Sequence, residues 1–566
     1  MSIDDIPLEQ LSESHVLILG AGPVGLVLAL VLARHGIPSV LLEKNTSITR
    51  FPKMDLTLAR SMEIFRQLGV PSDEPFNVRF SSGLGSNTPP LSTWSLPSVD
   101  EYRKTISAKD DGSMPREPWQ RITGDALERL FRAECEASPL VDARYSWLVT
   151  DALEDQTGVE VTAQEPNGKP AKIRAGYTVG CEGANSVLRN KLGIILDGGA
   201  LTHAAHLIHF KSRDLIKLHA QGNFWHTFFP SNPEKHQGSL GGAIIAQDAK
   251  EVWTIHDYLT PGADLSEENA QETIMRVLGG MGEAYSIQVD EILAQSTFKP
   301  TVALAQTWVG KHQRAILAGD SAHQTVPSGG YGMNMGFIDA WALGWRLAGR
   351  IQGWGGPQLL STYEAERRSV AELKQHWGKT HGMRLMGLSR VVTLDPNVIN
   401  ASTDEARDLR ARIDEYIQKN DDHNQSLGVE MGYRYESSLC VDNPLNKQLP
   451  PPEFDHRHYI PTTHPGYRAP HVFLKDGSSI FDSYGVGYTL VAFKDSEGMH
   501  VFQAVAKESS LPLKVLLLFD ESHAAAVWAA DLVLVRPDGH VAWRGNGSVS
   551  QLDASMVLHQ ATGYVV

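Results

Sequence analysis

A chain of 566 residues can hold two or three domains and a large hydrophobic core. Its formal net charge of −15 and its lack of a basic block argue against a nucleic-acid-binding surface. The cysteines lie far apart and form no CxxC pair, which favours a reducing, cytoplasmic compartment (Cys135, Cys181 and Cys440). The N-terminal residues MSIDDIPLEQ are acidic, unlike a targeting peptide, and the apolar run 24–33 is too short to span a bilayer.

A strand–turn–helix pattern opens the chain. Residues 15–19 (HVLIL) predict a buried parallel strand, a helix then runs to about His35, and a second strand covers residues 39–42. The turn after the first strand is GAGPVG, a GxGxxG motif, and an acidic residue ends the second strand, where it can accept hydrogen bonds from ribose hydroxyls. This context predicts a dinucleotide site without deciding between FAD and NAD. Its residues are Gly20, Gly22, Pro23, Val24, Gly25, Glu43 and Lys44.

The next part of the chain contains two helices and a loop-rich segment. Residues 51–70 predict a helix, and Asp55 and Arg60 flank its start, although both could equally be solvated surface groups. Residues 71–118, rich in Pro, Ser, Gly and Asn, indicate a loop-rich excursion into a second domain. The second helix begins after Thr123, a suitable N-cap.

Strands dominate the middle of the chain. Short strands alternate through residues 144–179, and residues 180–194 (GCEGANSVLRNKLGI) then make another glycine turn into a helix. Residues 205–300 mix strands with polar turns. The aromatic run FWHTFF within them could line a substrate pocket through Trp225, His226 and Phe228, or it could simply be strand core.

The most informative segment is residues 311–350. A short strand, 315–318, leads into Gly319 and Asp320, a polar loop, a glycine cluster and a helix. The glycines let a backbone approach a flat ligand closely, and the helix start directs free N–H groups at negative charge (Gly329, Gly330, Gly332 and Gly336). The segment therefore predicts a site for an anionic or electron-accepting ring, with an ordinary glycine-rich loop as the alternative.

The sequence pattern changes in the C-terminal part of the chain, from helical periodicity to short β-rich runs. Residues 359–390 indicate helix, and residues 391–465 indicate helix followed by a linker. From about residue 467, short β-rich runs (HVFL, GYTLVAF, KVLLLF and DLVLV) alternate with Asp-Gly turns. We expect a separate small α/β domain there.

Three separated stretches resemble one family. GAGPVG with Glu43, GCEGANSVLR, and GDSAHQTVPSGGYGMNMGFIDAWALGWRLAG match the motifs of the single-component FAD-dependent aromatic hydroxylases, the group A flavoprotein monooxygenases. The phenol hydroxylase branch fits best, because RAPHVFLKDGSSIFDSYG and RPDGHVAWR resemble its thioredoxin-like tail. A redox role for this tail is not expected, since it has no cysteine pair.

The resemblance implies an α/β fold with a discontinuous domain plan. A Rossmann-like FAD-binding domain, of the glutathione-reductase and p-hydroxybenzoate-hydroxylase type, would comprise residues 1–70, 119–195 and 301–390. A β-sheet substrate domain would comprise residues 71–118 and 196–300. A helical segment and linker would occupy residues 391–465, and a thioredoxin-like α/β domain residues 466–566. A homodimer is a family-level expectation.

The resemblance also assigns roles to individual residues. The first glycine motif would face the FAD pyrophosphate, Glu43 the adenosine ribose, Arg60 the ribityl-phosphate part and Asp320 a ribityl hydroxyl or the phosphate side. Backbone groups of the glycine cluster would meet the flavin ring. The middle motif would serve both FAD and NAD(P)H. The remaining contacts would come from Gln120, Glu182, Gly183, Arg189, Gly319, Pro327, Gly330, Gly332, Met333 and Asn334.

Three positions depart from the family pattern. The usual Asp-Gly is Glu182-Gly183, whose carboxylate reaches one methylene further. The glutamine expected near residues 122–128 aligns with Gly124, although Gln120 is close by. The usual Pro-Pro is Val326-Pro327.

The function implied is NAD(P)H- and O₂-dependent hydroxylation of an aromatic, phenolic substrate through a flavin hydroperoxide, with NADPH or NADH as transient reductant and no metal. Asp55 matches an aspartate of the phenol hydroxylases that deprotonates the substrate, and we expect it to act as general base. One alternative is Baeyer–Villiger or epoxidising chemistry on a polyketide-like natural product. The other, from a different class, is a non-catalytic flavin-binding interaction protein.

Overall fold

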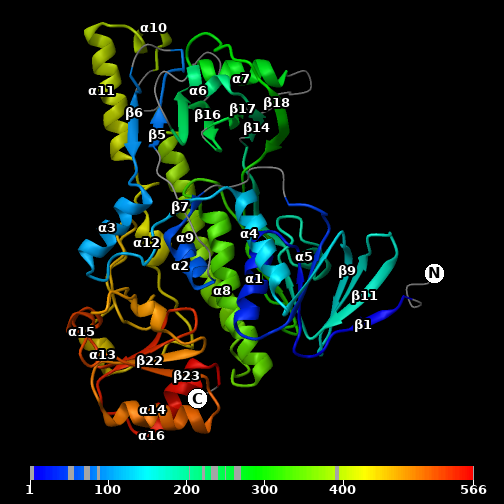
Figure 1. Cartoon of the computed structure of the whole chain (residues 1–566), viewed down its shortest axis with the longest axis vertical. Helices are drawn as coiled ribbons and strands as arrows, with labels where there is room; N and C mark the ends of the chain where they lie inside the picture. The colour runs from blue at the N-terminus through cyan, green and yellow to red at the C-terminus, as the bar shows by residue number, and fades with distance from the viewer. Residues whose placement is uncertain are drawn as a thin grey trace.

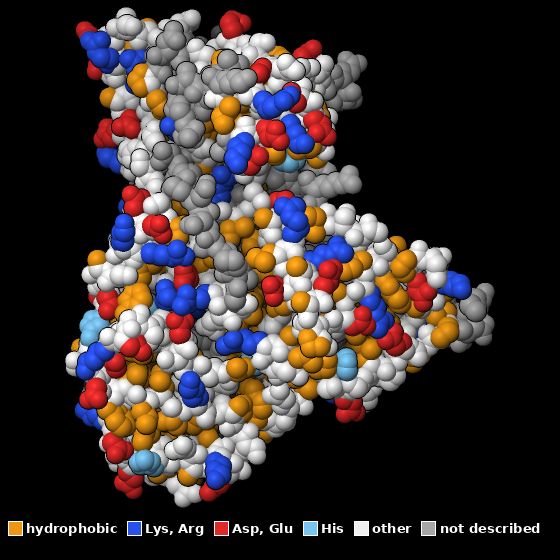
Figure 2. Space-filling view, in the orientation of Figure 1, with side chains coloured by type: hydrophobic (Ala, Val, Ile, Leu, Met, Phe, Trp, Pro, Cys, Tyr) orange, Lys and Arg blue, Asp and Glu red, His pale blue; other side chains and the backbone are white. Residues whose placement is uncertain are grey.

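The computed structural model describes residues 6–48, 56–68, 77–85, 89–202, 204–218, 224–230, 240–248, 250–259, 269–388 and 394–564. Three lobes meet around the long helix α8 (Tyr331–Gln352), which lies at the centre of Figure 1. On the face in Figure 2, basic and acidic side chains lie interspersed. No helix within the described ranges is long and apolar enough to cross a membrane.

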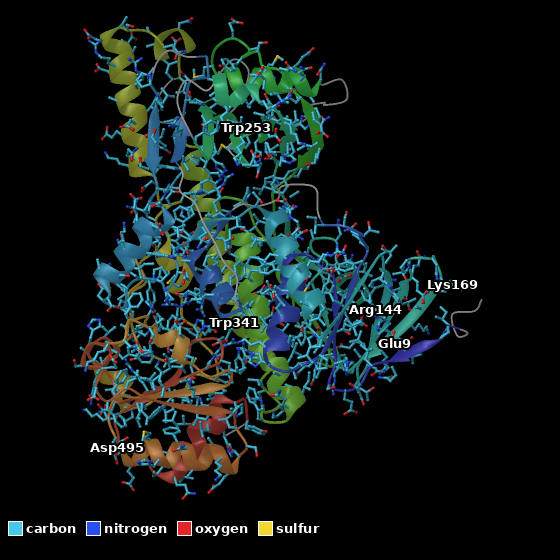
Figure 3. The ribbon with its side chains drawn as sticks, viewed as in Figure 1. Glu9, Arg144, Lys169, Trp253, Trp341 and Asp495 are labelled. Carbon is cyan, nitrogen blue, oxygen red and sulfur yellow. The ribbon has the colours of Figure 1, made fainter. Side chains whose placement is uncertain are left out.

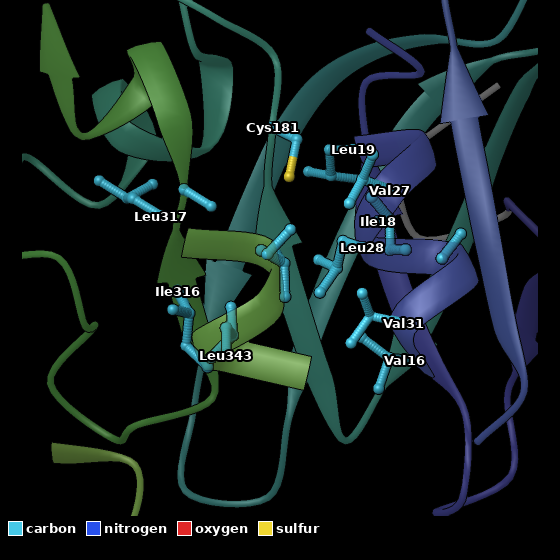
Figure 4. Packing of buried hydrophobic residues seen from close by; sticks show 14 of the residues in the cluster. Val16, Ile18, Leu19, Val27, Leu28, Val31, Cys181, Ile316, Leu317 and Leu343 are labelled. Atoms are coloured by element: carbon cyan, nitrogen blue, oxygen red, sulfur yellow. The ribbon is translucent and has the colours of Figure 1, made fainter. Parts of the chain in front are cut away.

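A parallel sheet forms the core of the central lobe. In the described residues its strand order is β20-β12-β2-β3-β8. The strands are β2 (Val16–Leu19), β3 (Ser39–Glu43), β8 (Val141–Tyr145), β12 (Tyr177–Gly180) and β20 (Ala315–Leu317). Because residues 16–19 and 40–42 are apolar on both faces, these two strands are buried between layers, as parallel strands require. Helix α1 (Pro23–Arg34) and α8 pack against one another and against the sheet, and Figure 4 shows Val27 and Val31 of α1 and Leu343 of α8 in the same apolar cluster.

Smaller elements surround the parallel sheet. Helices α2 (Ala59–Leu68), α4 (Gly124–Ala137) and α5 (Val187–Lys191), the 3₁₀ turn η2 (Gly319–Ser321) and the short pair β4 (Leu56–Thr57) and β7 (Gln120–Arg121) lie close to it. A four-stranded sheet, β1-β11-β10-β9, projects to the right in Figure 1. Its strands are β1 (Leu8–Gln10), β9 (Leu148–Glu154), β10 (Val159–Gln164) and β11 (Pro170–Ala175). Arg144 donates hydrogen bonds of 2.6 and 2.7 Å to Glu9, and these bonds join β8 to β1 (Figure 3).

A mixed sheet dominates the upper lobe of Figure 1. The described strands follow the order β18-β14-β17-β16-β15-β5-β6. They are β5 (Asn77–Phe80), β6 (Ser92–Ser95), β14 (Ala204–Lys211), β15 (His226–Pro230), β16 (Leu240–Ala246), β17 (Val252–Leu259) and β18 (Glu291–Phe298). Helices α7 (Ala270–Gly279), α10 (Pro396–Ile399) and α11 (Asp404–Lys419) accompany it, with the short helix α6 (Asp214–Leu218). Strands β13 (Leu196–Ala200), β19 (Thr301–Ala305) and β21 (His323–Gln324) link this lobe to the central one.

The lower lobe is a small α/β unit. Its sheet has the order β23-β22-β24-β25, within the part of the chain that the structure describes. The strands are β22 (Tyr488–Ala492), β23 (Leu513–Leu517), β24 (Leu532–Val535) and β25 (Val541–Gly545), and the helices are α14 (Glu497–Glu508), α15 (Ser522–Trp528) and α16 (Gln551–Ala561), with η4 (Ile480–Ser483). The long helix α9 (Ser361–Leu385) and the short helices α12 (Leu427–Met431) and α13 (Pro444–Gln448) connect the lobes.

The α/β class and the main elements agree with the sequence-based prediction, with three differences. In the segment predicted to be helical, residues 51–70, the structure has strand β4 before α2 begins at Ala59. Helix α3 (Val99–Lys109) interrupts the segment expected to be loop-rich, and Ser98 and Glu101 form a capping box at its start. The run HVFL, residues 471–474, was expected to be a strand. It lies outside the four-stranded sheet and makes only an isolated bridge between Phe473 and Ser479.

Buried charges join the central lobe to the lower one. Glu63 on α2 accepts hydrogen bonds from Arg60 and Arg468, and Arg60 also donates to the Asp538 carbonyl oxygen at 2.6 Å. A second group centres on Glu366 of α9, which pairs with Arg346 and Arg536. Every one of these side chains is at most 5 % exposed, so the lower lobe is docked through ion pairs shielded from water.

Candidate functional site

The glycine turn between β2 and α1 is shaped by close backbone contacts. Gly20 has φ +96, and a Cβ there would lie 2.7 Å from the Cys181 carbonyl oxygen. A Cβ on Gly25 would lie 2.0 Å from the Gly20 carbonyl oxygen. In contrast, a Cβ on Gly22 meets no protein atom within 4 Å, so this side of the turn is open. Gly22 is also the N-cap of α1 and provides no side-chain cap, which leaves N–H groups of the first turn available to an anion.

Glu43 stands beside this turn. One carboxylate oxygen accepts a 2.8 Å hydrogen bond from the Ala21 N–H, and the other accepts bonds of 2.8 and 2.7 Å from the backbone and side chain of Asn45. These bonds hold the Glu43 carboxyl group at the carboxyl end of β3, next to the open side of the turn. Lys44, the following residue, is exposed.

The second of the three family-like stretches, GCEGANSVLR (residues 180–189), has a structural role that its sequence did not reveal. Glu182 accepts a 2.5 Å hydrogen bond from the Ser186 hydroxyl and a 3.0 Å bond from the Val187 N–H, so its carboxylate caps the short helix α5. Burial raises the pKa of Glu182. Gly183 follows with φ +80, and Arg189 donates to the carbonyl oxygens of Ala184 and Ser321 at 2.8 and 3.1 Å. The motif thus fixes the turn η2 that carries Asp320.

The turn η2 lies at the end of β20. The Gly319 N–H donates to the buried Asp339 carboxylate at 3.0 Å, and Asp339 also pairs with His323 and Arg367 at 2.6 and 2.8 Å. Asp320 is exposed beside this anchored turn. Asp339, which the sequence analysis missed, sets the position of the turn from inside α8.

The start of α8 is clamped to β4. Asn334 accepts a 2.9 Å bond from the Leu58 N–H and donates to the carbonyl oxygens of Leu56 and Gly330 at 3.0 and 2.7 Å. Gly330 has φ +65 and is the N-cap, and a Cβ there would lie 2.9 Å from Leu56. Gly332 and Met333 are half-buried in the first turn of the helix, and Pro327 is exposed just before it. The glycine cluster therefore presents backbone, with its conformation fixed by the Asn334 side chain.

Gln120 is buried without a hydrogen-bond partner. It is 1 % exposed, and neither its amide oxygen nor its amide nitrogen has a partner in the described part of the protein. Thr57, directly opposite it in the β4–β7 pair, has an unpartnered hydroxyl as well. Buried polar groups are normally hydrogen-bonded, so this pair fits a polar ligand edge beside β4.

Arg60 points toward the lower lobe. Its side chain is 5 % exposed, and its guanidinium donates hydrogen bonds to Glu63 at 2.9 Å and to the Asp538 carbonyl oxygen at 2.6 Å. These contacts explain its burial through the docking of α2 on the lower lobe. A contact from Arg60 to the flavin stays a prediction.

An aromatic wall, defined here as Phe80, Trp94, Trp225, His226, Phe228 and His423, extends across the upper lobe toward α8. Ring centroids are 4.5 Å apart for Trp225 and His226 and 5.5 Å apart for His226 and Phe228. Trp225 and Phe228 pack in the apolar cluster that also includes Leu56, whereas Phe224 and Phe229 pack in the cluster with α7. The predicted pocket residues therefore lie together, on the side of the strand nearest to β4.

The wall reaches the glycine cluster. Phe80 stacks on Phe228 at 5.3 Å and meets Trp94 edge-on at 5.0 Å, and Trp94 stacks on His423 at 6.4 Å. The His423 Nδ1 accepts a 3.2 Å hydrogen bond from the Gly329 N–H. The wall thus runs without a break from the mixed sheet to the loop that precedes α8.

One polar atom of the wall has no partner. The Nε2 of His226 is buried and makes no hydrogen bond to any described residue. Burial and the neighbouring Arg121 hold the pKa of His226 well below its ordinary value, so the ring is neutral at neutral pH. A neutral imidazole can donate to or accept from a ligand hydroxyl. Asp55, the predicted general base, lies outside the described residues.

Comparisons with known proteins identify the family. A family model described as "FAD binding domain" matches residues 13–376, and a second, "Aromatic-ring hydroxylase, C-terminal", matches residues 462–563. The chain is an FAD-dependent monooxygenase of the aromatic-ring hydroxylase family. These matches confirm the expected family, fold, cofactor and enzyme class.

Individual relatives support this assignment over the whole chain. An FAD-dependent monooxygenase of Penicillium oxalicum is 51 % identical over 90 % of this chain and 100 % of its own. One of Emericella nidulans is 46 % identical over 99 % of this chain and 92 % of its own. Among solved structures, the protein RebC, with bound 7-carboxy-K252c, is 26 % identical with a TM-score of 0.85, covering 99 % of this chain and 100 % of that one. The relatives named as monooxygenases argue against a non-catalytic flavin-binding protein.

The residues present fit FAD. Open space at Gly22 and free N–H groups on α1 suit a pyrophosphate, and the unpartnered Gln120 and Thr57 suit a polar edge of the cofactor. Glycine backbone at the start of α8 suits a flat ring.

Proposed function

We propose that this enzyme hydroxylates an aromatic ring that carries an acidic, phenolic hydroxyl, with NAD(P)H as the electron donor. The observation that carries the proposal is the aromatic wall, which ends at the loop before α8, where the flavin ring would meet glycine backbone. Stacked and edge-on rings favour a flat, electron-rich substrate. The partnerless Nε2 of His226 offers one hydrogen bond to a substrate hydroxyl.

The cofactor contacts predicted from the sequence belong to this proposal. Bound FAD would supply the oxygen-activating chemistry, with electrons from NAD(P)H. The glycine turn and α1 would hold the pyrophosphate, and Glu43 would accept hydrogen bonds from the ribose. Gly330, Gly332, Met333 and Asn334 would hold the ring through their backbone, close to the wall.

The chain's own chemistry would be to orient the ring, exclude water and remove a proton from the substrate hydroxyl. Removal of that proton makes the ortho and para carbons more electron-rich, which aids transfer of an electrophilic oxygen atom. Asp55 is the proposed general base because its position in the sequence matches that of the aspartate in the phenol hydroxylases.

The test is anaerobic reduction of the FAD-loaded enzyme by NADPH, and separately by NADH, with and without a panel of phenols. We expect the right phenol to accelerate loss of the oxidised-flavin absorbance. Reaction with ¹⁸O₂ followed by mass spectrometry should then show one labelled oxygen atom as a new ring hydroxyl. A labelled ring-expanded or epoxide product would contradict hydroxylation, and no product from any phenol would contradict the substrate class.

A further inference from the structure

Two stretches of the lower lobe have no part in the proposed chemistry. They are RAPHVFLKDGSSIFDSYG (residues 468–485) and RPDGHVAWR (residues 536–544). The structure brings them together, because the Ala469 N–H donates to the Gly539 carbonyl oxygen at 3.0 Å. Together they supply four charged side chains that face the rest of the protein, named here the contact surface (Arg468, Asp482, Arg536 and Asp538).

One face of α2 binds this contact surface. Arg60, Glu63 and Arg66 recur every third residue, which places them on the same side of the helix. Arg468 donates to Glu63 at 3.0 Å, and Arg66 donates to Asp482 at 3.1 and 2.9 Å. The opposite, apolar side of α2 packs in the core of the central lobe. Helix α2 is therefore held between the two lobes.

The contact surface also binds α8 and α9. The Asp538 carbonyl oxygen accepts a 2.6 Å bond from Arg60 of α2, and the Asp538 carboxylate accepts a 3.2 Å bond from the Trp345 Nε1 of α8. Arg536 donates two bonds of 2.7 Å to Glu366 of α9. One turn of the lower lobe thus fixes α2 relative to α8.

The starts of α2 and α8 hold strand β4. Within the described ranges, β4 is a two-residue strand that pairs with the equally short β7 alone. Its backbone is held instead by Asn334 of α8, which binds Leu56 and Leu58, and the chain enters α2 directly afterwards at Ala59. A shift of α2 relative to α8 would therefore displace β4, beside which the polar edge of the flavin is proposed to lie.

Ion pairs suit this positioning role better than they suit stability. A buried ion pair often stabilises a fold no better than apolar residues of the same volume, because both charges lose their water. Its hydrogen bonds are directional, however, and a guanidinium that binds both oxygens of a carboxylate fixes the geometry of the pair. Arg468 binds both oxygens of Glu63 in this way.

We propose that the contact surface of the lower lobe positions β4 and thereby aligns the flavin edge with the aromatic wall, an inference that rests on the proposed function. Arg468, Asp482 and Asp538 are positioning residues, because they act on the site through α2 and α8. With β4 in place, one oxygen atom goes to the ring. With β4 displaced, NAD(P)H, a proton and O₂ give NAD(P)⁺ and hydrogen peroxide, and the ring stays unchanged.

The competing explanation is that the apolar side of α2 alone holds this helix. Met62 and Phe65 pack in the central core, and the Phe65 ring meets that of Phe337 of α8 at 4.9 Å. On this explanation the contact surface only attaches the lower lobe, and weakening it would leave β4 where it is.

The test compares full-length wild type, Arg468→Gln and Asp482→Asn, each with and without FAD. Both variants remove one charge from the contact surface and keep a polar side chain. Thr463→Val is the matched control, because it deletes a buried hydroxyl that donates to the Trp528 carbonyl oxygen at 2.7 Å within the lower lobe. The first readout is amide hydrogen exchange of residues 56–60, with β2 as the measure of global unfolding. The second is the share of oxidised NADPH that yields hydroxylated product instead of hydrogen peroxide, per bound flavin.

We expect exchange of residues 56–60 to be about tenfold faster in Arg468→Gln than in wild type or Thr463→Val, with exchange of β2 unchanged. The product share of Arg468→Gln should fall about tenfold as hydrogen peroxide rises, and Asp482→Asn should show smaller changes in the same direction. Unchanged exchange of residues 56–60, an unchanged product share, or an equal effect of Thr463→Val would overturn the positioning role.

Two further outcomes are distinguishable. If wild type hydroxylates no phenol, the proposed function fails, and the exchange of residues 56–60 still decides whether the contact surface positions β4. If Arg468→Gln does not fold, Asp482→Asn decides by the same two readouts, because Asp482 is half-exposed and its loss is milder.

Discussion

Replacing Glu63 by Gln should destabilise the protein more than any exposed Glu→Gln change. Glu63 lies between Arg60 and Arg468, and its side chain is 1 % exposed. Glutamine keeps the shape but removes the negative charge, which leaves two buried guanidinium groups without an anion. Breaking a buried ion pair in this way costs about 3–5 kcal/mol.

The pKa of Glu63 gives a second estimate. Burial alone would raise this pKa, but Arg468 and Arg60 lower it from 4.5 to about 2. That difference corresponds to about 3 kcal/mol of stabilisation of the ionised form. Because the native pKa lies below the unfolded value, the contribution is complete above pH 4.5 and is lost as pH falls toward 2.

Urea unfolding at neutral pH, followed by circular dichroism, measures the effect through the free energy of the first transition. Glu134→Gln, exposed on α4, is the matched control and should change this free energy by less than about 0.5 kcal/mol. On acidification, wild type should approach Glu63→Gln in stability, since protonation removes the same charge. A loss below about 1 kcal/mol at neutral pH, or a constant gap at all pH values, would refute the argument.

Further predictions concern the cofactor and the wall. Gly22→Ala should leave the apoprotein as stable as wild type but weaken FAD binding about tenfold or more in a fluorescence titration. Gly25→Ala, whose Cβ would lie 2.0 Å from a backbone oxygen, should weaken FAD binding and also destabilise the apoprotein. Equal effects of the two variants on apoprotein stability would argue against a pyrophosphate at Gly22. His226→Phe should lower kcat/KM for the phenol about tenfold with FAD affinity unchanged, and an unaltered value would exclude His226 from substrate contact. Asp55→Ala should lower the coupled hydroxylation rate by about 10²-fold with FAD still bound, and an unchanged rate would remove it as general base.

Local patterns predicted the elements around the first glycine turn well. Residues 16–19 and 40–42 are apolar and lie on both faces of the parallel sheet, and the close contact at Gly25 is with the Gly20 carbonyl oxygen inside the turn itself. Helix α3 was missed because a composition rich in turn-forming residues hid a local signal, the Ser98–Glu101 capping box.

The remaining features of the fold and the site depend on long-range contacts, which the sequence alone did not reveal. Arg60 and Asp538 are 478 positions apart in sequence, and no periodicity relates them. Likewise, the position of Glu182 as a helix cap depends on the turn that follows, so its sequence motif alone suggested a cofactor ligand. Only part of the aromatic wall could be predicted from the sequence. Residues 224–229 are consecutive, whereas His423 joins the wall from another part of the chain.

The strand order of the parallel sheet determines when the site can be assembled during synthesis. β2, β3, β8 and β12 are complete once residue 180 has been made, and they are neighbours in the sheet. β20 is synthesised much later and adds to the free edge of β12, carrying the turn η2 and α8 with it. Until residue 317 leaves the ribosome, the nascent sheet has an unpaired apolar edge and only part of the proposed flavin site. Because the edge strand is made late, we expect the incomplete sheet to be the aggregation-prone state during synthesis.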